Sequence, residues 1–191
     1  LAPYSLQLEK EVHDGRMEAV KAFTKVNNIN QITVPTRDAW LGIIAAGKTY
    51  YDVRQALMEI GLSDADLEHK GIRILKLGMI FPVEASILKE FAHGLEEILV
   101  IEEKRSFVEM FCKEILYGTP DTPRIVGKKD ETGRPLVKAD SELDADDIVR
   151  ILARRFEERI DVPNLDRRLK EISMLPDLGT IPILSRQPYF C

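Results

Sequence analysis

The residues with the clearest chemical potential form a glycine–lysine–threonine motif. Gly42, Gly47, Lys48 and Thr49 match the spacing of a phosphate-binding loop, G-x-x-x-x-G-K-[ST]. In such a loop the backbone N–H groups surround phosphate oxygens, the lysine contacts them, and the hydroxyl binds magnesium. This chemistry requires a complete strand before the first glycine and a flexible turn between the two glycines.

The residues between the two glycines favour a different structure. Ile43 and Ile44 are the best strand formers of this region, yet they lie inside the segment that would have to curl around an anion. The pattern therefore predicts a buried strand over Trp40–Ala46, which Gly47 ends and which a helix follows. An independent nucleotide-binding protein that uses Gly42–Thr49 is the alternative hypothesis.

The other reactive side chains show no pattern typical of catalysis. His13, His69 and His93 have no pairing spacing, so we expect structural roles for them. Cys112 and Cys191 are too far apart to indicate a disulfide framework or a metal site, and Cys112 is expected in the core. We assign no catalytic, cofactor-binding or metal-binding residue to the chain.

The composition is that of an ordinary globular domain. The 191 residues are 45% hydrophobic and 31% charged, and the net charge of -5 argues against broad nucleic-acid binding. The longest apolar runs, Leu41–Ala46 and Ile98–Ile101, are far shorter than the roughly 20 residues of a membrane helix. We expect a cytoplasmic protein without disulfides. We also expect both ends to be cuts within a longer chain, since the first residue is leucine.

Buried strands alternate with amphipathic helices, which predicts a largely parallel sheet with helices on both faces. The expected strands are Trp40–Ala46, Ile72–Leu77, Glu97–Ile101 and Arg124–Val126. The expected helices are Leu6–Asn27, Tyr50–Ile60, a short helix opened by Ser63–Asp66, Glu84–Ala92, Lys104–Leu116, Asp144–Ile160 and Asn164–Ile172. Pro82 is expected in a first helical turn, and Phe107 and Phe111 are expected to point inward.

Three segments should meet at one edge of this sheet. Gly47–Thr49, Gly78–Ile80 and Glu102–Lys104 each follow an expected strand, and parallel strands end at a common edge where ligands and partners gather. One hypothesis is that this edge is a contact surface for a neighbouring domain or, as a weaker alternative, for an anion. The interpretation that we favour for the charged residues is helix capping, which explains them without any ligand. Glu102 and Glu103 are expected to cap the next helix, because carboxylates suit the positive end of a helix.

Several of these segments also resemble a known enzyme family. Leu41–Leu57 resembles the 2-oxoacid:ferredoxin oxidoreductases, and within them the indolepyruvate:ferredoxin oxidoreductases. Gly71–Pro82 and Glu96–Arg105 continue the resemblance in register, as does the helix that ends near Tyr117. The tail Arg186–Cys191 resembles the segment that leads into the family's thiamine diphosphate domain.

The resemblance implies both a fold and a parent reaction. The fold would be a three-layer α/β/α domain with a mostly parallel five-stranded sheet, like the transketolase C-terminal domain. The parent enzyme would oxidatively decarboxylate arylpyruvates with coenzyme A, giving acyl-CoA, carbon dioxide and reduced ferredoxin. Thiamine diphosphate with magnesium would supply the carbanion chemistry, and iron–sulfur clusters would carry the electrons. The implied partners are neighbouring domains, a second subunit and ferredoxin.

The resemblance places the catalytic residues of the parent outside this chain. The pyrimidine-activating glutamate would lie upstream, and the diphosphate and magnesium ligands downstream. Cys191 matches the first cysteine of a C-x-x-C element, but one thiolate cannot hold a cluster. We therefore expect a non-catalytic scaffold and interface domain that is inactive alone. A stand-alone interaction module is the remaining alternative.

The chain divides into three parts under this interpretation. Residues 1–36 are expected to form a helical arm or linker, 37–140 the α/β domain, and 141–191 a helical linker with an extended tail. The arm and the segment from Asp144 onward are expected to pack against domains that this chain lacks.

Overall fold

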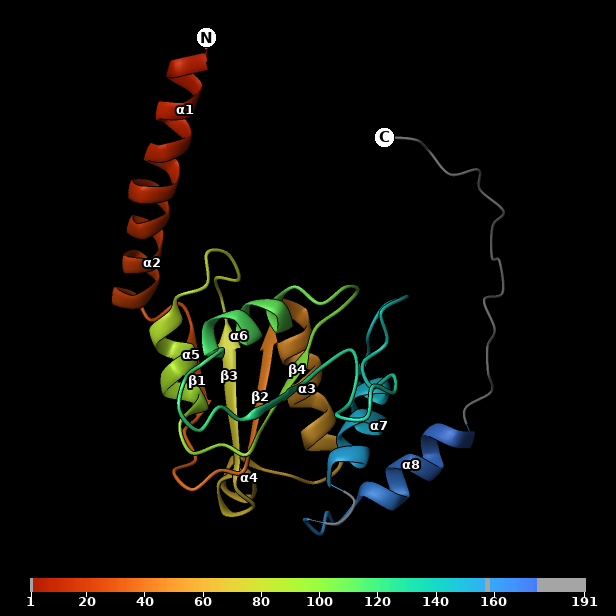
Figure 1. The fold of residues 1–191 in the computed structure, drawn as a ribbon. Helices are drawn as coiled ribbons and strands as arrows, with labels where there is room; N and C mark the ends of the chain where they lie inside the picture. The colour runs from red at the N-terminus through yellow and green to blue at the C-terminus, as the bar shows by residue number, and fades with distance from the viewer. Residues whose placement is uncertain (1, 157–158, 175–191) are drawn as a thin grey trace, which may run out of the picture.

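A five-stranded sheet forms the centre of the computed structural model, which describes residues 2–156 and 159–174 (Figure 1). Its strands are β1 (Gln31–Val34), β2 (Leu41–Ala46), β3 (Ile72–Leu77), β4 (Glu97–Ile101) and β5 (Arg124–Val126). The strand order is β1-β3-β2-β4-β5, and only β1 runs antiparallel to its neighbour. The four predicted strands are confirmed. The short edge strand β1 lies in a segment that was expected to belong to the arm.

Helices cover both faces of this sheet, which confirms a three-layer α/β/α fold (Figure 1). One face packs against α3 (Gly47–Glu59), α4 (Asp64–His69), α7 (Ala145–Phe156) and α8 (Leu165–Met174). The other face packs against α5 (Ala85–Ala92) and α6 (Val108–Leu116). No helix in the described part of the chain is both long enough and apolar enough to span a membrane.

Strand β2 is the most completely buried element. It pairs with β3 on one side and β4 on the other, and its residues from Leu41 to Ala45 are all buried. Leu41, Ile43 and Ala45 contribute to one face of the core and Ile44 to the other. Gly42 faces the end of α5 so closely that a Cβ atom there would clash with Leu95 and Phe91. The glycine is therefore required by packing.

Helix α6 begins later than the sequence predicts. The helix was expected from residue 104, but it starts at Val108. The carboxylate of Glu102 accepts hydrogen bonds from the N–H groups of Phe107, Val108 and Glu109, at 2.8–3.1 Å. This confirms the predicted cap for Glu102 and keeps the intervening residues out of the helix. The prediction is wrong for Glu103, whose carboxylate accepts from the N–H group of Leu143 instead. The prediction that Phe107 points inward is wrong, because this side chain is 40% exposed.

Pro82 lies outside helix α5, so its predicted place in a helical turn is also wrong. The peptide bond between Phe81 and Pro82 is cis, and Glu84 occupies the N-cap position. The Glu84 carboxylate accepts from the N–H groups of Ser86 and Ile87 at 2.9 and 3.1 Å. These bonds satisfy two free donors of the first turn, so the helix can begin after the proline.

The two ends of the described chain pack differently. Helix α7 was expected to pack against missing domains, but it packs against α3, and Ile148, Leu152 and Phe156 are fully buried in the core. The expectation is wrong for this helix because its apolar face completes the domain's own core. The segments α1 (Ala2–Glu11), η1 (Val12–Arg16) and α2 (Met17–Val26) instead form a rod that projects from the domain (Figure 1).

The rod leaves several large apolar side chains in solvent, as expected of an arm. Tyr4, Leu6, Phe23 and Val26 are all exposed. Its π-helical centre, η1, contains Gly15, where an added Cβ atom would meet no other atom within 4 Å. The rod therefore exposes apolar surface, and it has room for a side chain at Gly15.

Alanine substitutions at Gly42 and Gly15 should distinguish the effect of core packing on stability from the effect of helix propensity. Gly42→Ala should lower the free energy of unfolding by about 1–3 kcal/mol, because the methyl group overpacks the contact with Leu95 and Phe91. Gly15→Ala is the control, and it should raise stability by up to about 1 kcal/mol. Urea unfolding followed by circular dichroism measures both. Equal stability of Gly42→Ala and the wild type would contradict the close packing of β2.

Candidate docking site at the carboxyl edge of the sheet

The carboxyl edge of the sheet contains a topological switch point. The chain leaves β2 towards α3 on one face, and it leaves the adjacent strand β4 towards α6 on the opposite face. The two connections diverge, so a crevice opens between the strand ends. In open α/β sheets this is the position at which ligands and partners usually bind.

A hollow of about 230 Å³ occupies this position, and we call it the switch-point hollow. It is lined by Ala46, Thr49, Ile80, Ile101, Glu102, Glu103, Arg105, Phe107 and Val108. Each of the three segments that the sequence predicts at this edge contributes to it, through Thr49, Ile80 and the two glutamates. The shared edge is therefore confirmed, and the lining is apolar at its floor and charged at its rim.

Lys48 does not reach into this hollow, and the phosphate-loop hypothesis is wrong. Its ammonium group donates to Asp52 at 2.9 Å and to the carbonyl of Leu143 at 2.8 Å. The hydrogen bond to Asp52 raises the pKa of Lys48. The backbone between Gly42 and Ala46 is paired with β3 and β4 as a flat strand. Its amide groups are therefore used by the sheet, and the lysine fastens the segment before α7.

The charged side chains around the switch-point hollow differ in whether they already have hydrogen-bond partners. Glu102 caps α6, and Glu103 accepts from the N–H group of Leu143 at 3.2 Å. Lys104 donates to the carbonyl of Ser141 at 2.6 Å. Arg105 forms no hydrogen bond or ion pair with any residue in the described ranges. A single unengaged cation thus stands beside the hollow.

An aromatic patch adjoins the hollow, and it is exposed at Phe81 and Phe107 but half-buried at Phe111, which packs against the core. Phe81, Phe107 and Phe111 contact one another, with ring centroids 5.1–6.4 Å apart. Phe81 is 51% exposed, and the neighbouring Ile80 and Met110 are 41% and 56% exposed. We call these five residues the aromatic patch. Contiguous apolar surface of this kind marks a contact site in soluble proteins.

The aromatic patch was not predicted from the sequence. Helical spacing puts Phe107 and Phe111 on one face, and an apolar helical face usually indicates the core. The signal that was available is the Phe81–Pro82 pair in the turn that follows the strand Ile72–Leu77, at the same edge of the sheet as the start of the helix after Glu97–Ile101. Neither segment alone indicates exposure, which depends on how the turn and α6 meet.

Comparison with known proteins decides the family. Residues 31–176 match the family described as the indolepyruvate oxidoreductase domain. The chain belongs to this family. The indolepyruvate oxidoreductase subunit IorA of Pyrococcus horikoshii is 33% identical over 123 residues, which cover 63% of this chain and 18% of the relative. The IorA subunit of Thermococcus kodakarensis is 41% identical over 80 residues, covering 42% and 11%. The chain thus spans less than a fifth of these relatives.

Two solved structures are similar to this indolepyruvate oxidoreductase domain in fold. A split-gene transketolase has a TM-score of 0.44 at 15% identity, and the match covers 69% of this chain and 42% of that one. The 2-oxoglutarate:ferredoxin oxidoreductase of Magnetococcus marinus has a TM-score of 0.45 at 17% identity, covering 72% and 21%.

The remaining sequence candidates stay apart in the domain. His13 lies in the arm, His69 ends α4, and His93 follows α5, so the three histidines belong to separate elements. Cys112 is buried in the core as predicted, and burial raises the pKa of its thiol to about 12. Cys191 lies outside the described residues. Within the described ranges, no group of three His, Cys, Asp or Glu side chains could hold a metal ion.

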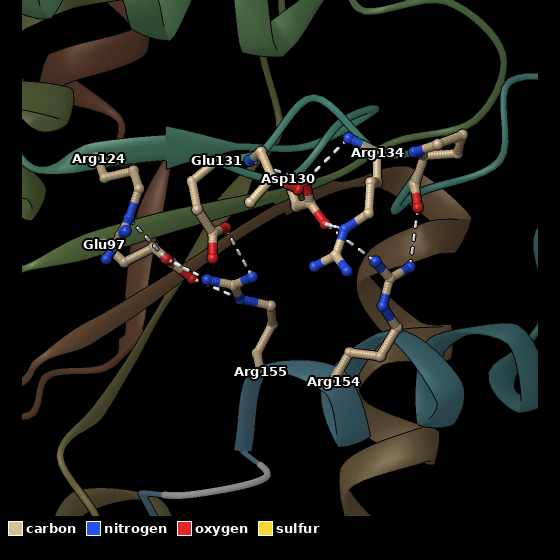
Figure 2. A network of polar contacts seen from close by, with 9 residues as sticks. Glu97, Arg124, Asp130, Glu131, Arg134, Arg154 and Arg155 are labelled. Atoms are coloured by element: carbon tan, nitrogen blue, oxygen red, sulfur yellow. Dashed lines mark hydrogen bonds and ion pairs between the residues drawn. The ribbon is translucent and has the colours of Figure 1, made fainter.

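The opposite edge of the sheet carries a network of arginines and carboxylates (Figure 2). Glu97, at the start of β4, is almost fully buried, and both of its oxygens accept from Arg155 of α7. Arg124 of β5 donates to the same carboxylate at 3.1 Å. The third nitrogen of Arg155 donates to Glu131 at 3.0 Å. One buried carboxylate therefore connects two strands and a helix.

A second buried carboxylate, Asp130, extends this network (Figure 2). Its oxygens accept from Arg134 at 3.0 Å and from Arg154 of α7 at 3.1 Å. The hydroxyl of Thr132 and the backbone N–H groups of Thr132 and Arg134 also donate to it. These hydrogen bonds, with that of the Thr132 hydroxyl as the largest cause, hold the pKa of Asp130 well below its usual range. The hollow of about 190 Å³ beside the network is lined by groups that are already paired. We assign this edge to structure, because the network fastens α7.

Removal of one charge should show how far the domain depends on this network. Glu97→Gln should lower the free energy of unfolding by about 3 kcal/mol, because it leaves the buried Arg155 without its carboxylate. The matched control is Glu96→Gln, since Glu96 forms an exposed pair with Arg159 that contributes little. Urea unfolding measures both variants. Equal effects of the two substitutions would contradict the structural role of Glu97.

Proposed function

We propose that this chain is the non-catalytic scaffold and interface domain of a thiamine diphosphate-dependent indolepyruvate:ferredoxin oxidoreductase. The parent reaction would be the oxidative decarboxylation of arylpyruvates to acyl-CoA, with reduction of ferredoxin. Family membership over residues 31–176 supports the parent. The observation that carries the interface role is the aromatic patch beside the switch-point hollow, because a domain that functions alone would gain nothing from exposing it.

The switch-point hollow does not fit a diphosphate with magnesium. A diphosphate with magnesium requires cationic donors and acidic ligands that point into one cavity. At the switch-point hollow Lys48 points away, Glu102 is committed to a helix cap, and the floor is apolar. Thiamine diphosphate and magnesium would accordingly bind to other parts of the parent, which would also carry the iron–sulfur clusters and use coenzyme A as co-substrate.

The domain would act on the reaction by positioning its neighbours. A rate that depends on two halves of a cofactor site is sensitive to their relative placement, since even small displacements of reacting groups lower it. The aromatic patch offers a rigid contact for this purpose, because its residues lie on α6 and on a turn fixed between β3 and α5. The proposal therefore needs only a stable docking surface, without a catalytic residue.

The same proposal covers the division of the chain into three parts, its binding partners and its cellular compartment. Residues 1–36 would hold the arm, with Gln31–Val34 joining the sheet as β1. Residues 37–140 would hold the main α/β domain, and 141–191 the helical linker and tail towards a downstream domain. The partners would be neighbouring domains, a second subunit and ferredoxin, in the cytoplasm.

Disruption of the aromatic patch in the full-length enzyme tests this function. Phe81→Ser combined with Phe107→Ser should lower indolepyruvate-dependent ferredoxin reduction by at least about tenfold, because truncated interface anchors commonly cost over 1 kcal/mol. Met58→Ser, an exposed site on α3, should leave activity within about twofold. The isolated domain carrying the two patch substitutions should keep its unfolding midpoint. Wild-type activity of the double variant would refute the interface role.

A further inference from the structure

We propose that the switch-point hollow and Arg105 together receive one bulky apolar side chain and an adjacent carboxylate from a neighbouring segment of the parent enzyme. This inference rests on the proposed function, and it adds the chemistry of the contact. The site is distinct from the rest of the aromatic patch because it combines a cavity with a free cation.

The shape of the hollow suits a single apolar anchor. Ala46 and Ile101 end the two central strands and form the floor, while Val108 and Phe107 form a wall at the start of α6. The volume of about 230 Å³ leaves room for one large side chain. Interfaces draw most of their affinity from a few anchors that fill such pockets, and these anchors are surrounded by contacts that exclude water.

The charges at the rim favour a carboxylate partner. Glu102 and Glu103 also line the hollow, but their carboxylates already accept hydrogen bonds from backbone N–H groups, and Glu103 lies 3.9 Å from the ammonium group of Lys48. Lys48 and Lys104 donate to backbone carbonyls of the segment before α7. Arg105 alone is unengaged among these groups of the described chain. A guanidinium offers two parallel donors to a carboxylate, so it would select an acidic residue beside the anchor.

The occupant is expected in the parent polypeptide, outside the part that this chain matches. The chain matches only 18% of the length of the IorA subunit of Pyrococcus horikoshii, so most of a protein of that kind lies outside the match. The hollow is also continuous with the aromatic patch through Ile80 and Phe107, which line both. A segment that packs on the patch would therefore bring one of its side chains over the hollow.

Site-specific crosslinking in the full-length enzyme identifies the occupant. Met110 lies one helical turn from Phe107 and is exposed, so Met110→p-benzoylphenylalanine places a photoreactive group beside the hollow. Mass spectrometry should find one crosslinked peptide, from outside residues 31–176, that contains a large apolar residue within three positions of Asp or Glu. A peptide without a carboxylate would overturn the inference, and so would a crosslink to the same patch of a second copy.

Charge reversal tests the role of Arg105. Arg105→Glu should reduce the crosslinked fraction at least tenfold, and replacement of the identified carboxylate by lysine should restore it. Arg167→Glu, on the exposed surface of α8, is the matched control and should leave crosslinking unchanged. If Phe107→Ser abolishes crosslinking and Arg105→Glu does not, the proposed function survives and the inference fails. If neither substitution changes it, both fail.

Discussion

The complete burial of β2 constrains the rest of the domain. A strand that is paired on both sides and covered on both faces must be apolar throughout, and its backbone groups must all be used within the sheet. It follows that no amide of this strand is available to an anion. The burial also requires a glycine opposite Phe91, and it fixes the carboxyl end of β2 beside that of β4, where the switch-point hollow forms. The candidate site is thus a consequence of how the central strand is packed.

The central strands were predictable from the sequence because their short, continuous apolar runs are stable only when they are buried in a sheet. The residues Leu41–Ala46, Ile72–Leu77 and Glu97–Ile101 read directly as strands, and the capping box at Ser63 marked the start of α4. Strand β1 was missed because four residues with a polar start carry little signal and depend on pairing with β3. The later start of α6 was missed for a similar reason, since the carboxylate of Glu102 determines it across an intervening turn.

The two edges of the sheet show what sequence alone does not reveal about a site. Both edges are rich in charged residues in the sequence, yet at the amino edge almost every carboxylate is paired with an arginine, while the carboxyl edge leaves Arg105 and the aromatic patch without partners among the described residues. The type of residue therefore did not reveal the candidate site. The two edges differ in whether their side chains already have partners within the described part of the domain. Phe107 illustrates this, because its helical spacing indicates a core position and only the tertiary arrangement exposes it.

The burial of β2 also explains the contacts of Lys48, which lies at the start of α3. Once the strand amides are committed to the sheet, Lys48 has no phosphate to contact, and it donates instead to Asp52 and to the carbonyl of Leu143. Lys104 donates to Ser141 in the same segment, so two cations of this edge hold the chain that leads into α7. Because α7 is fastened at the opposite edge by Glu97 and Asp130, the outer layer is fixed at both ends. Because α7 is held at both edges of the sheet, the domain can present its exposed docking surface rigidly. A rigid surface is what a domain needs in order to position neighbouring domains.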